Sequence, residues 1–340
     1  MARDGSPGPL PVIRNTMGTV PASASIPLKH HSFHAADREW PESNCYVDLW
    51  IEILHASRLE VAPLLPFTLA SDFEGDQWTF YKPPLSDLSR LYGLEVEELN
   101  IWRDLLAHCV EQVARGRMPM VEMDAFYLPD THGRGYQAVH SKTTIGIQAI
   151  DTQRQSLRYL HNRGVYELDG ADYRGIFRLH PPTAPESLPP YCEIAKLDRV
   201  VRHDPADLRN ISLELAATLL ARRPQTNPIT RYAETVGDQL SQLIAEQPQA
   251  FDLYAFATIR QCGSCFGFTA DYLRWLAQQD PGWNDGAAAF GRISSLASML
   301  VLKMARIVHS GRLKDLGDTF REMSAAWDLG MQEVEQRLQA

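Results

Sequence analysis

The stretch SNCYVDLWIE, residues 43–52, decides the fold of the N-terminal half, because it opens an amphipathic helix with a cysteine in its first turn. Asn44 belongs to the residue types that cap helices, which places Cys45 directly after the cap. The unpaired N–H groups and the positive dipole end at a helix start favour a thiolate over a thiol. We therefore predict a nucleophile at Cys45, although free cysteines also commonly serve as small core residues. The apolar face of the helix carries Tyr46, Leu49, Trp50, Ile53 and Leu54.

The bulk composition is that of an ordinary soluble protein. The chain has 340 residues, 44% of them hydrophobic, and a formal net charge of −9 at pH 7. This charge gives no global attraction to nucleic acid, so an RNA contact would need a local basic patch. The five scattered cysteines favour a reducing cytoplasm over a disulfide framework. The apolar segment 293–308 is shorter than the roughly 20 residues of a membrane span, so it predicts a buried helix and no membrane partner.

Composition divides the chain into four parts, with about two folded domains expected for this length. Residues 1–36 are rich in Pro, Gly, Ser and Ala without the apolar run of a signal peptide, and they predict a flexible tail. Residues 37–180 predict a mixed α and β domain. The prolines that begin at 181 indicate a linker over 181–205. Residues 206–340 predict an all-helical domain.

The clearest strand covers 140–150, with Ile145 and Ile147 on one face and Lys142 and Thr144 on the other. A return strand is expected over 157–162. The polar run between them favours a long connecting loop, from about 148 to 156. Further strands are expected over 77–82 and 120–128, and a polar helix over 95–115. The C-terminal helices are expected over 208–223, 229–246, 252–279, 286–312 and 313–338.

A cysteine nucleophile needs a base, and usually a third group that orients the base. His140 opens the strand 140–150 and lies 95 residues after Cys45. This order of helix cysteine and strand histidine is similar to that of papain-like enzymes. Asn162, His161 and Asp151 are the candidates for the third group. We favour Asn162, because a long loop would return it close to Lys142, whereas a tight loop would leave it about 20 Å from His140.

Several segments resemble those of a bacterial family catalogued as a domain of unknown function, over nearly the whole chain after the tail. More distantly, the cysteine helix, the Phe-Tyr-Leu-Pro element and the histidine strand are similar to the N-terminal domain of butirosin-type acyltransferases. Those papain-like enzymes move an aminoacyl group from a carrier-protein thioester onto an amine. Members of the family also resemble the valanimycin-type transferases, which take an amino acid from an aminoacyl-tRNA. The segments that carry the resemblance are 44–52, 78–84, 124–130, 140–142 and 159–162.

The resemblance implies an α+β fold, a papain-like domain of a central helix and an antiparallel sheet followed by an all-helical domain. It implies a cytoplasmic aminoacyltransferase of a biosynthetic pathway that works through a Cys45 thioester. His140 would protonate the leaving group and then act as base for an amine or hydroxyl acceptor. The backbone N–H of Cys45 and the Asn44 side chain would hold the oxyanion. Glu39 lies six residues before the cysteine, where papain has a glutamine, so that glutamine donor is not carried over.

The implied partners are a carrier protein or an aminoacyl-tRNA and a small-molecule acceptor, with no cofactor beyond a phosphopantetheine that the donor could carry. The amino acid, the acceptor and the choice of donor stay open. The same residues would also suit a papain-like amidase or peptidase, or a binding module without catalysis.

Six further residues are candidates for substrate binding, and each also has an ordinary structural explanation as a surface or strand residue. Two lysines could contact a donor phosphate, two residues could hold the substrate's α-amino group, and a polar pair could line the acyl pocket. In that order they are Lys82 and Lys142, Asp124 and Tyr127, and Arg260 and Gln261. Cys262 and Cys265 have the spacing of a redox or zinc half-site, but no second pair accompanies them, so no metal is predicted.

Overall fold

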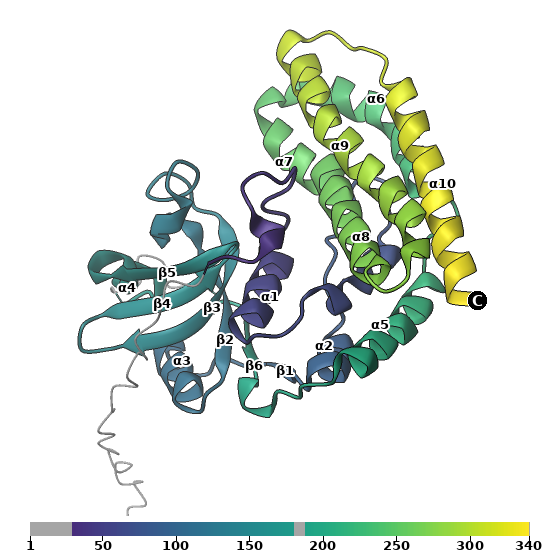
Figure 1. Cartoon of the computed structure of the whole chain (residues 1–340). Coiled ribbons are helices and arrows are strands. Elements are labelled where there is room, and N and C mark those ends of the chain that lie inside the picture. Colours follow the sequence, from purple (N-terminus) through teal and green to yellow (C-terminus); the bar gives the residue numbers. More distant parts are fainter. Residues whose placement is uncertain (1–28, 180–187, 340) are drawn as a thin grey trace, which may run out of the picture.

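The computed structural model describes residues 29–179 and 188–339. Within these ranges the chain forms a mixed lobe that contains a β-sheet and a second lobe built from long helices (Figure 1). This arrangement confirms the predicted α+β class with a helical C-terminal region. Most of the predicted tail lies outside the described residues.

The sheet has six strands in the order β1-β6-β2-β3-β4-β5, and every neighbouring pair is antiparallel. Helix α1 covers one face, and α3 and α4 lie over the other (Figure 1). The strands are β1 Val96–Glu98, β2 Met118–Asp124, β3 Lys142–Asp151, β4 Ser156–His161, β5 Gly164–Asp169 and β6 Cys192–Ala195. The helices of this lobe are α1 Cys45–Ala56, α2 Leu85–Tyr92, α3 Leu105–Ala114 and α4 Gly170–Ile176.

The hairpin β3–β4 has the predicted faces but not the predicted loop. Ile145 and Ile147 are buried in the core on the α3 side, whereas Gly146 faces Leu49 of α1. The strands pair as far as Asp151 and Ser156, so the connection is tight and the long loop from 148 to 156 is wrong. The Asp151 carboxylate accepts the N–H groups of residues 153 and 154. The polar residues therefore close a short turn through a side-chain to backbone contact.

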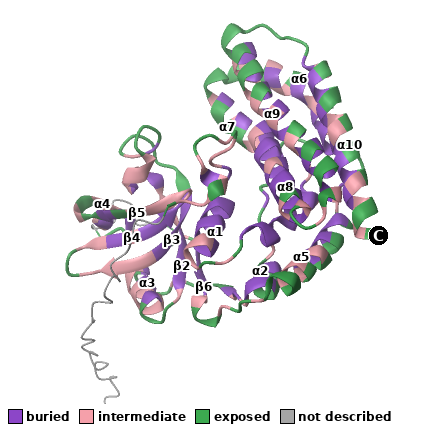
Figure 2. Ribbon diagram, viewed as in Figure 1, coloured by how far each residue is buried: buried purple, intermediate pink, exposed green. Residues whose placement is uncertain are grey.

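Helix α1 begins as predicted. The Asn44 side chain accepts the backbone N–H of Val47, and residues 46–54 are all buried. Such continuous burial is possible because α1 lies between the sheet and the helical lobe (Figures 1 and 2). On the sheet side the helix approaches β3 at Gly146, where a Cβ in place of the glycine hydrogen would lie 3.1 Å from the Leu49 side chain.

The segment before α1 is part of the folded lobe, so the predicted tail boundary at residue 36 is too late. His34 is buried, and its Nδ1 lies 2.6 Å from Glu52 Oε1 and its Nε2 lies 3.5 Å from Asp48 Oδ1. Both carboxylates belong to α1 and are themselves buried. Burial alone would lower the pKa of His34, but the hydrogen bonds and charges of Asp48 and Glu52 outweigh it and raise the pKa to about 9.

The proposed linker 181–205 contains an element of the sheet. Strand β6 pairs with both β1 and β2, and it therefore lies in the sheet interior. It completes the mixed lobe from the C-terminal side of the proline-rich segment, of which residues 180–187 lie outside the described ranges. Proline density alone placed the end of the mixed lobe too early, because the four residues of β6 follow the prolines and still belong to the sheet.

Three further predictions in the mixed lobe are wrong. Within residues 77–82, only Trp78 takes part in a β-bridge, an isolated one with Phe73. The strand does not extend further because the backbone N–H of Trp78 is donated to the carbonyl of Ala257 in the helical lobe. The helix expected over 95–115 is shorter, since β1 occupies Val96–Glu98 and the Asp104 side chain caps α3. Strand β2 ends at Asp124 rather than 128, where a short 3₁₀ turn begins.

The helical lobe follows the predicted order. The expected helix 252–279 is interrupted by a π-helical turn at Phe256–Arg260. The helices are α5 Pro205–Leu220, α6 Pro228–Glu246, α7 Phe251–Ala255, α8 Gln261–Ala277, α9 Asn284–Ser310 and α10 Gly317–Gln339. By length and apolar content the segment Pro281–Ser310 could cross a membrane, but α9 buries Phe290, Leu300 and Met304 in the core against α8 and α10.

We expect the stability conferred by His34 to depend on pH. Because the folded-state pKa of about 9 lies above the ordinary 6.5, the contribution is complete below pH 6.5 and is lost as pH rises through 9. Its full size is about 3 kcal/mol. Urea unfolding of the wild type and His34→Gln between pH 6 and 9.5 should give a stability difference that shrinks toward high pH. A difference that stays constant over this range would contradict a buried imidazolium.

Candidate active site

Cys45 is the partly exposed member of the five cysteines, and the other four are buried. Its Sγ lies 3.8 Å from Thr144 Oγ1 on β3. The thiol is therefore held at the start of α1, between the helix and the strand, and keeps access to the surface. This position is the one that the sequence predicted for a nucleophile.

The first turn of α1 offers backbone donors beside the sulfur. The N–H groups of Val47 and Asp48 are taken by the side chain and the carbonyl of Asn44. Those of Cys45 and Tyr46 have no acceptor within the described part of the chain, as expected for a helix start. The Asn44 side chain, predicted as an oxyanion donor, is buried and donates to the Tyr81 carbonyl. The Asn44 side chain is thus committed to the cap and to Tyr81, whereas the two backbone N–H groups remain available.

The pairing of β2 with β3 places several polar residues on the same face of the sheet as Cys45. Glu122 pairs with Thr144, and Asp124 pairs with Lys142, so these four side chains point to one side. Lys142 Nζ lies 2.7 Å from Glu122 Oε1. Since Thr144 contacts Cys45, this side is the α1 face of the sheet.

His140 forms a pair with Asp124 rather than with Cys45. Its Nδ1 lies 2.6 Å from Asp124 Oδ2, and its ring stacks on Phe126 with centroids 4.3 Å apart. His140 lies two residues before β3, which begins at Lys142, so the prediction that it opens the strand is wrong. Its partner Asp124 is paired with Lys142. Asp124 therefore holds His140 on the side of the sheet that carries Cys45. Glu122 is paired with Thr144, which contacts Cys45, and Lys142 is paired with Asp124, which contacts His140.

The three candidates for the third catalytic group lie elsewhere. Asn162 occupies the β4–β5 turn with a φ of 44°, opposite the Thr144 end of β3 and not beside His140. His161 is buried on the opposite face, where its Nε2 bonds Thr143 and its Nδ1 bonds Asp130. Asp151 closes the turn at the far end of β3. The group that orients His140 is instead Asp124, which the sequence had suggested for substrate binding.

Asp124 could have been found from the sequence by aligning the strands. An antiparallel pairing of 118–124 with 142–146 brings position 124 to the start of the histidine strand. Without that strand register, the sequence does not indicate that the Asp124 carboxylate lies beside His140.

Two other candidates for substrate binding lie on opposite sides of the sheet. Tyr127 packs on α4, where a Cβ on Gly175 would meet its ring, and so it belongs to the core away from Cys45. Lys82 lies near the cysteine helix, with its Nζ 4.5 Å from the ring centroid of Tyr46. The Tyr46 hydroxyl donates to the buried Glu193, and burial together with that carboxylate raises the pKa of Tyr46 well above its ordinary value.

Arg260 and Gln261 lie at the junction of the π-helical turn and α8. Gln261 is 2% exposed, and neither polar atom of its side chain has a hydrogen-bond partner. Cys262 and Cys265 are buried in α8, and burial raises the pKa of both thiols, that of Cys265 to about 12. Among residues 29–179 and 188–339, no group of three or more His, Cys, Asp or Glu could hold a metal ion.

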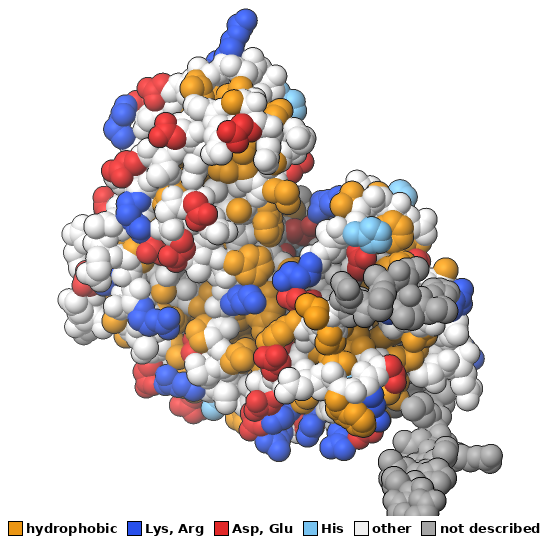
Figure 3. All heavy atoms as spheres, turned by 180° about the vertical axis from the view of Figure 1, so that it is seen from behind, with side chains coloured by type: hydrophobic (Ala, Val, Ile, Leu, Met, Phe, Trp, Pro, Cys, Tyr) orange, Lys and Arg blue, Asp and Glu red, His pale blue; other side chains and the backbone are white. Residues whose placement is uncertain are grey.

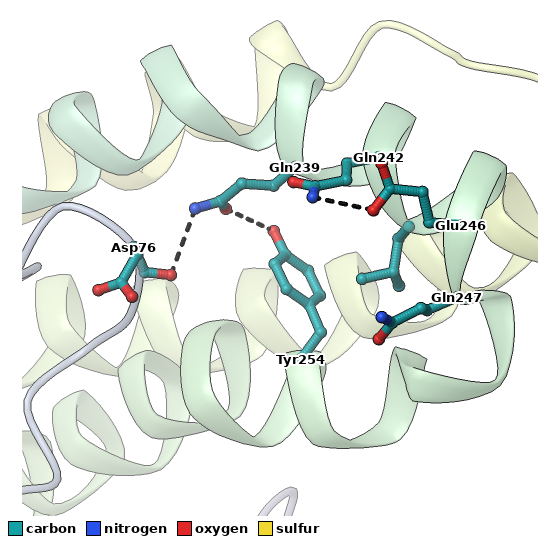
Figure 4. A pocket seen from close by; sticks show the side chains of 7 residues that line it. Asp76, Gln239, Gln242, Glu246, Gln247 and Tyr254 are labelled. Carbon is teal, nitrogen blue, oxygen red and sulfur yellow. Dashed lines mark hydrogen bonds between the residues drawn. The ribbon is translucent and has the colours of Figure 1, made fainter.

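The helical lobe carries a separate polar pocket between α6, α7 and the loop at Asp76. Figure 4 shows Gln239 bridging this pocket, since it donates to the Asp76 carbonyl and accepts from the Tyr254 hydroxyl. Gln242 similarly donates to Glu246. The polar groups of the pocket therefore largely satisfy one another. Its lining is Asp76, Gln239, Gln242, Leu243, Glu246, Gln247 and Tyr254.

The fold and the site define an α+β protein with a helix-start cysteine on one face of an antiparallel sheet. The chain belongs to the DUF1839 family, because residues 29–197 match the DUF1839 N-terminal domain and residues 205–336 match the DUF1839 C-terminal domain. The first match begins at the segment that carries His34 and ends after β6, in agreement with the limits of the mixed lobe. No curated protein matches the chain.

We expect Asn44→Ala to lower the free energy of unfolding by about 1–2 kcal/mol, because it removes a helix cap. The variant also loses the bond to the Tyr81 carbonyl. Asn44→Ser is the matched control, since serine keeps a capping oxygen but is too short to bond Tyr81. Urea unfolding should place this variant between the wild type and Asn44→Ala. Equal losses in both variants would show that the cap contributes nothing.

Proposed function

We propose that the protein is a cysteine-dependent aminoacyltransferase with a papain-like catalytic lobe. The observation that carries the proposal is the position of Cys45 at a helix start, on the same sheet face as the pair His140–Asp124. A nucleophile, backbone donors for an oxyanion and an oriented imidazole are the parts that acyl transfer needs.

In the first step, the Cys45 sulfur attacks the carbonyl carbon of an aminoacyl thioester or ester. The carbonyl oxygen becomes an oxyanion near the N–H groups of Cys45 and Tyr46. The bond to the donor then breaks, and the imidazolium of His140 protonates the departing sulfur or oxygen. The aminoacyl group is left on Cys45 as a thioester.

In the second step, His140 removes a proton from an amine or hydroxyl acceptor, which attacks the Cys45 thioester. The carbon–sulfur bond breaks, and the Cys45 thiolate leaves. Asp124 holds the His140 ring and stabilises its protonated form. The atom that leaves and the atom that attacks are both bonded to the acyl carbon, so the His140 ring must come within hydrogen-bond reach of that position during the reaction.

The donor is an acyl carrier protein or an aminoacyl-tRNA. Both present an activated aminoacyl group that a thiolate can accept. Lys82 beside Tyr46 is a cation that suits the phosphate near the activated end of either donor.

The central test is whether an aminoacyl group is trapped on Cys45. Charged carrier protein and aminoacyl-tRNA are offered separately, and the one that is the donor should add one aminoacyl mass to the wild type by intact mass spectrometry, and none to Cys45→Ala. Cys109→Ala is the control, because this cysteine is buried on the other side of the sheet. In His140→Ala, transfer to an acceptor should fall by about 10²–10⁴-fold.

An adduct that persists in Cys45→Ala would refute the nucleophile. Donor turnover in water at an unchanged rate without acceptor would instead indicate an amidase or peptidase. If a Cys45→Ser strain made the pathway product at the normal level, the protein would be a binding module without catalysis.

A further inference from the structure

The ion pair Glu122–Lys142 lies on the α1 face of the sheet, beside the residues that contact Cys45 and His140, and we propose that this pair binds the acceptor and selects an amine that also carries a carboxylate. The acceptor class would thus be a free amino acid or another amino-carboxylate. This inference rests on the proposed function, because it concerns the second step of the transfer.

The position of the pair follows from strand geometry. Thr144 and Lys142 project from the same face of β3, one two-residue step of about 6.6 Å apart. Their partners on β2, Glu122 and Asp124, project from that face beside them. Thr144 contacts Cys45, and Asp124 holds His140. The acceptor must lie where it reaches both the thioester on Cys45 and the base His140. The side chains beneath that position are those of Lys142 and its partner Glu122.

The charges of the pair match an amino-carboxylate. The Lys142 ammonium would bind the carboxylate of the acceptor, and the Glu122 carboxylate would bind its ammonium before deprotonation. The pair can exchange partners, because Lys142 is 70% exposed and Glu122 is 27% exposed. An ion pair of this exposure contributes little to stability, so its opening costs little.

The surface where the two lobes meet is mixed in character. From behind, hydrophobic side chains gather where the lobes meet, with basic and acidic side chains among them (Figure 3). Lys82 is the contrasting lysine near the site, since it lies over the rings of Tyr46 and Phe80 rather than beside a strand carboxylate.

The chemistry balances without a further reactant. The acceptor ammonium first loses a proton to solvent or to Glu122. The free amine attacks the thioester carbon, a carbon–nitrogen bond forms and the carbon–sulfur bond breaks. One of the two amine protons passes to His140 and then to the Cys45 thiolate, and the other stays on the amide nitrogen. The product is an amide that keeps the carboxylate bound by Lys142.

The test compares two sets of acceptors on the full-length protein. Cys45 is loaded with an aminoacyl N-acetylcysteamine thioester, and an equimolar mixture of proteinogenic amino acids or of their α-amides is added. We expect amide products to form at least 10-fold faster from the amino acids. Simple reactivity would favour the α-amides, whose amines are less basic and more fully deprotonated at neutral pH.

In Lys142→Met the preference for the amino acids over the α-amides should fall below 2-fold. Lys82→Met is the matched control and should keep the preference. Equal rates for both sets in the wild type, or a preference that survives in Lys142→Met, would overturn the proposal.

A second measurement separates this inference from the proposed function. If Cys45 takes up no acyl group, the transferase proposal fails, and equilibrium dialysis of Cys45→Ser with the labelled amino acid mixture then tests the site alone. Binding that is lost on Lys142→Met supports the site. No binding, or equal binding by both proteins, overturns it.

Discussion

The burial of α1 between the sheet and the helical lobe is the constraint on which the rest of the structure depends. The helix can approach β3 because Gly146 has no side chain where Leu49 packs. Apolar residues of α1 share one continuous core with α8 and the later helices. The start of the helix is thereby fixed against Thr144, which determines where the Cys45 sulfur lies. Hydrophobic burial is non-directional, so the direction of the helix must come from polar contacts.

Those polar contacts are buried charges, which is a costly way to fix a helix. Asp48 accepts both the backbone N–H and the hydroxyl of Ser43, and so it holds the turn that leads into Cys45. His34 lies against the same carboxylate and against Glu52. The segment before the helix, the cap and the helix itself are therefore joined in one network. A buried carboxylate without these partners would disrupt α1 instead of holding it.

Local sequence patterns predicted those features of the fold that depend on the geometry of a single element. The cap at Asn44, the faces of β3 and the order of the late helices all follow from spacing within a single element. The errors concern partners that are distant in the chain. Residues 77–82 have the composition of a strand, but the backbone N–H of Trp78 is donated to Ala257. The short segment β6 is a strand because β1 and β2 pair with it on both sides. The partner of His140 likewise depends on a register between strands, which no single segment of the sequence contains.

The separation of Cys45 from His140 determines how the two residues can cooperate. A base that contacts the sulfur would mainly generate the thiolate, whereas at this site the helix start itself favours negative charge. In the proposed transfer, the imidazole serves the atom that leaves or attacks at the acyl carbon. The second substrate would lie over Lys142, which is one two-residue step from Thr144 and is paired with Asp124, the partner of His140. The charges of Lys142 and Glu122 would then select the acceptor.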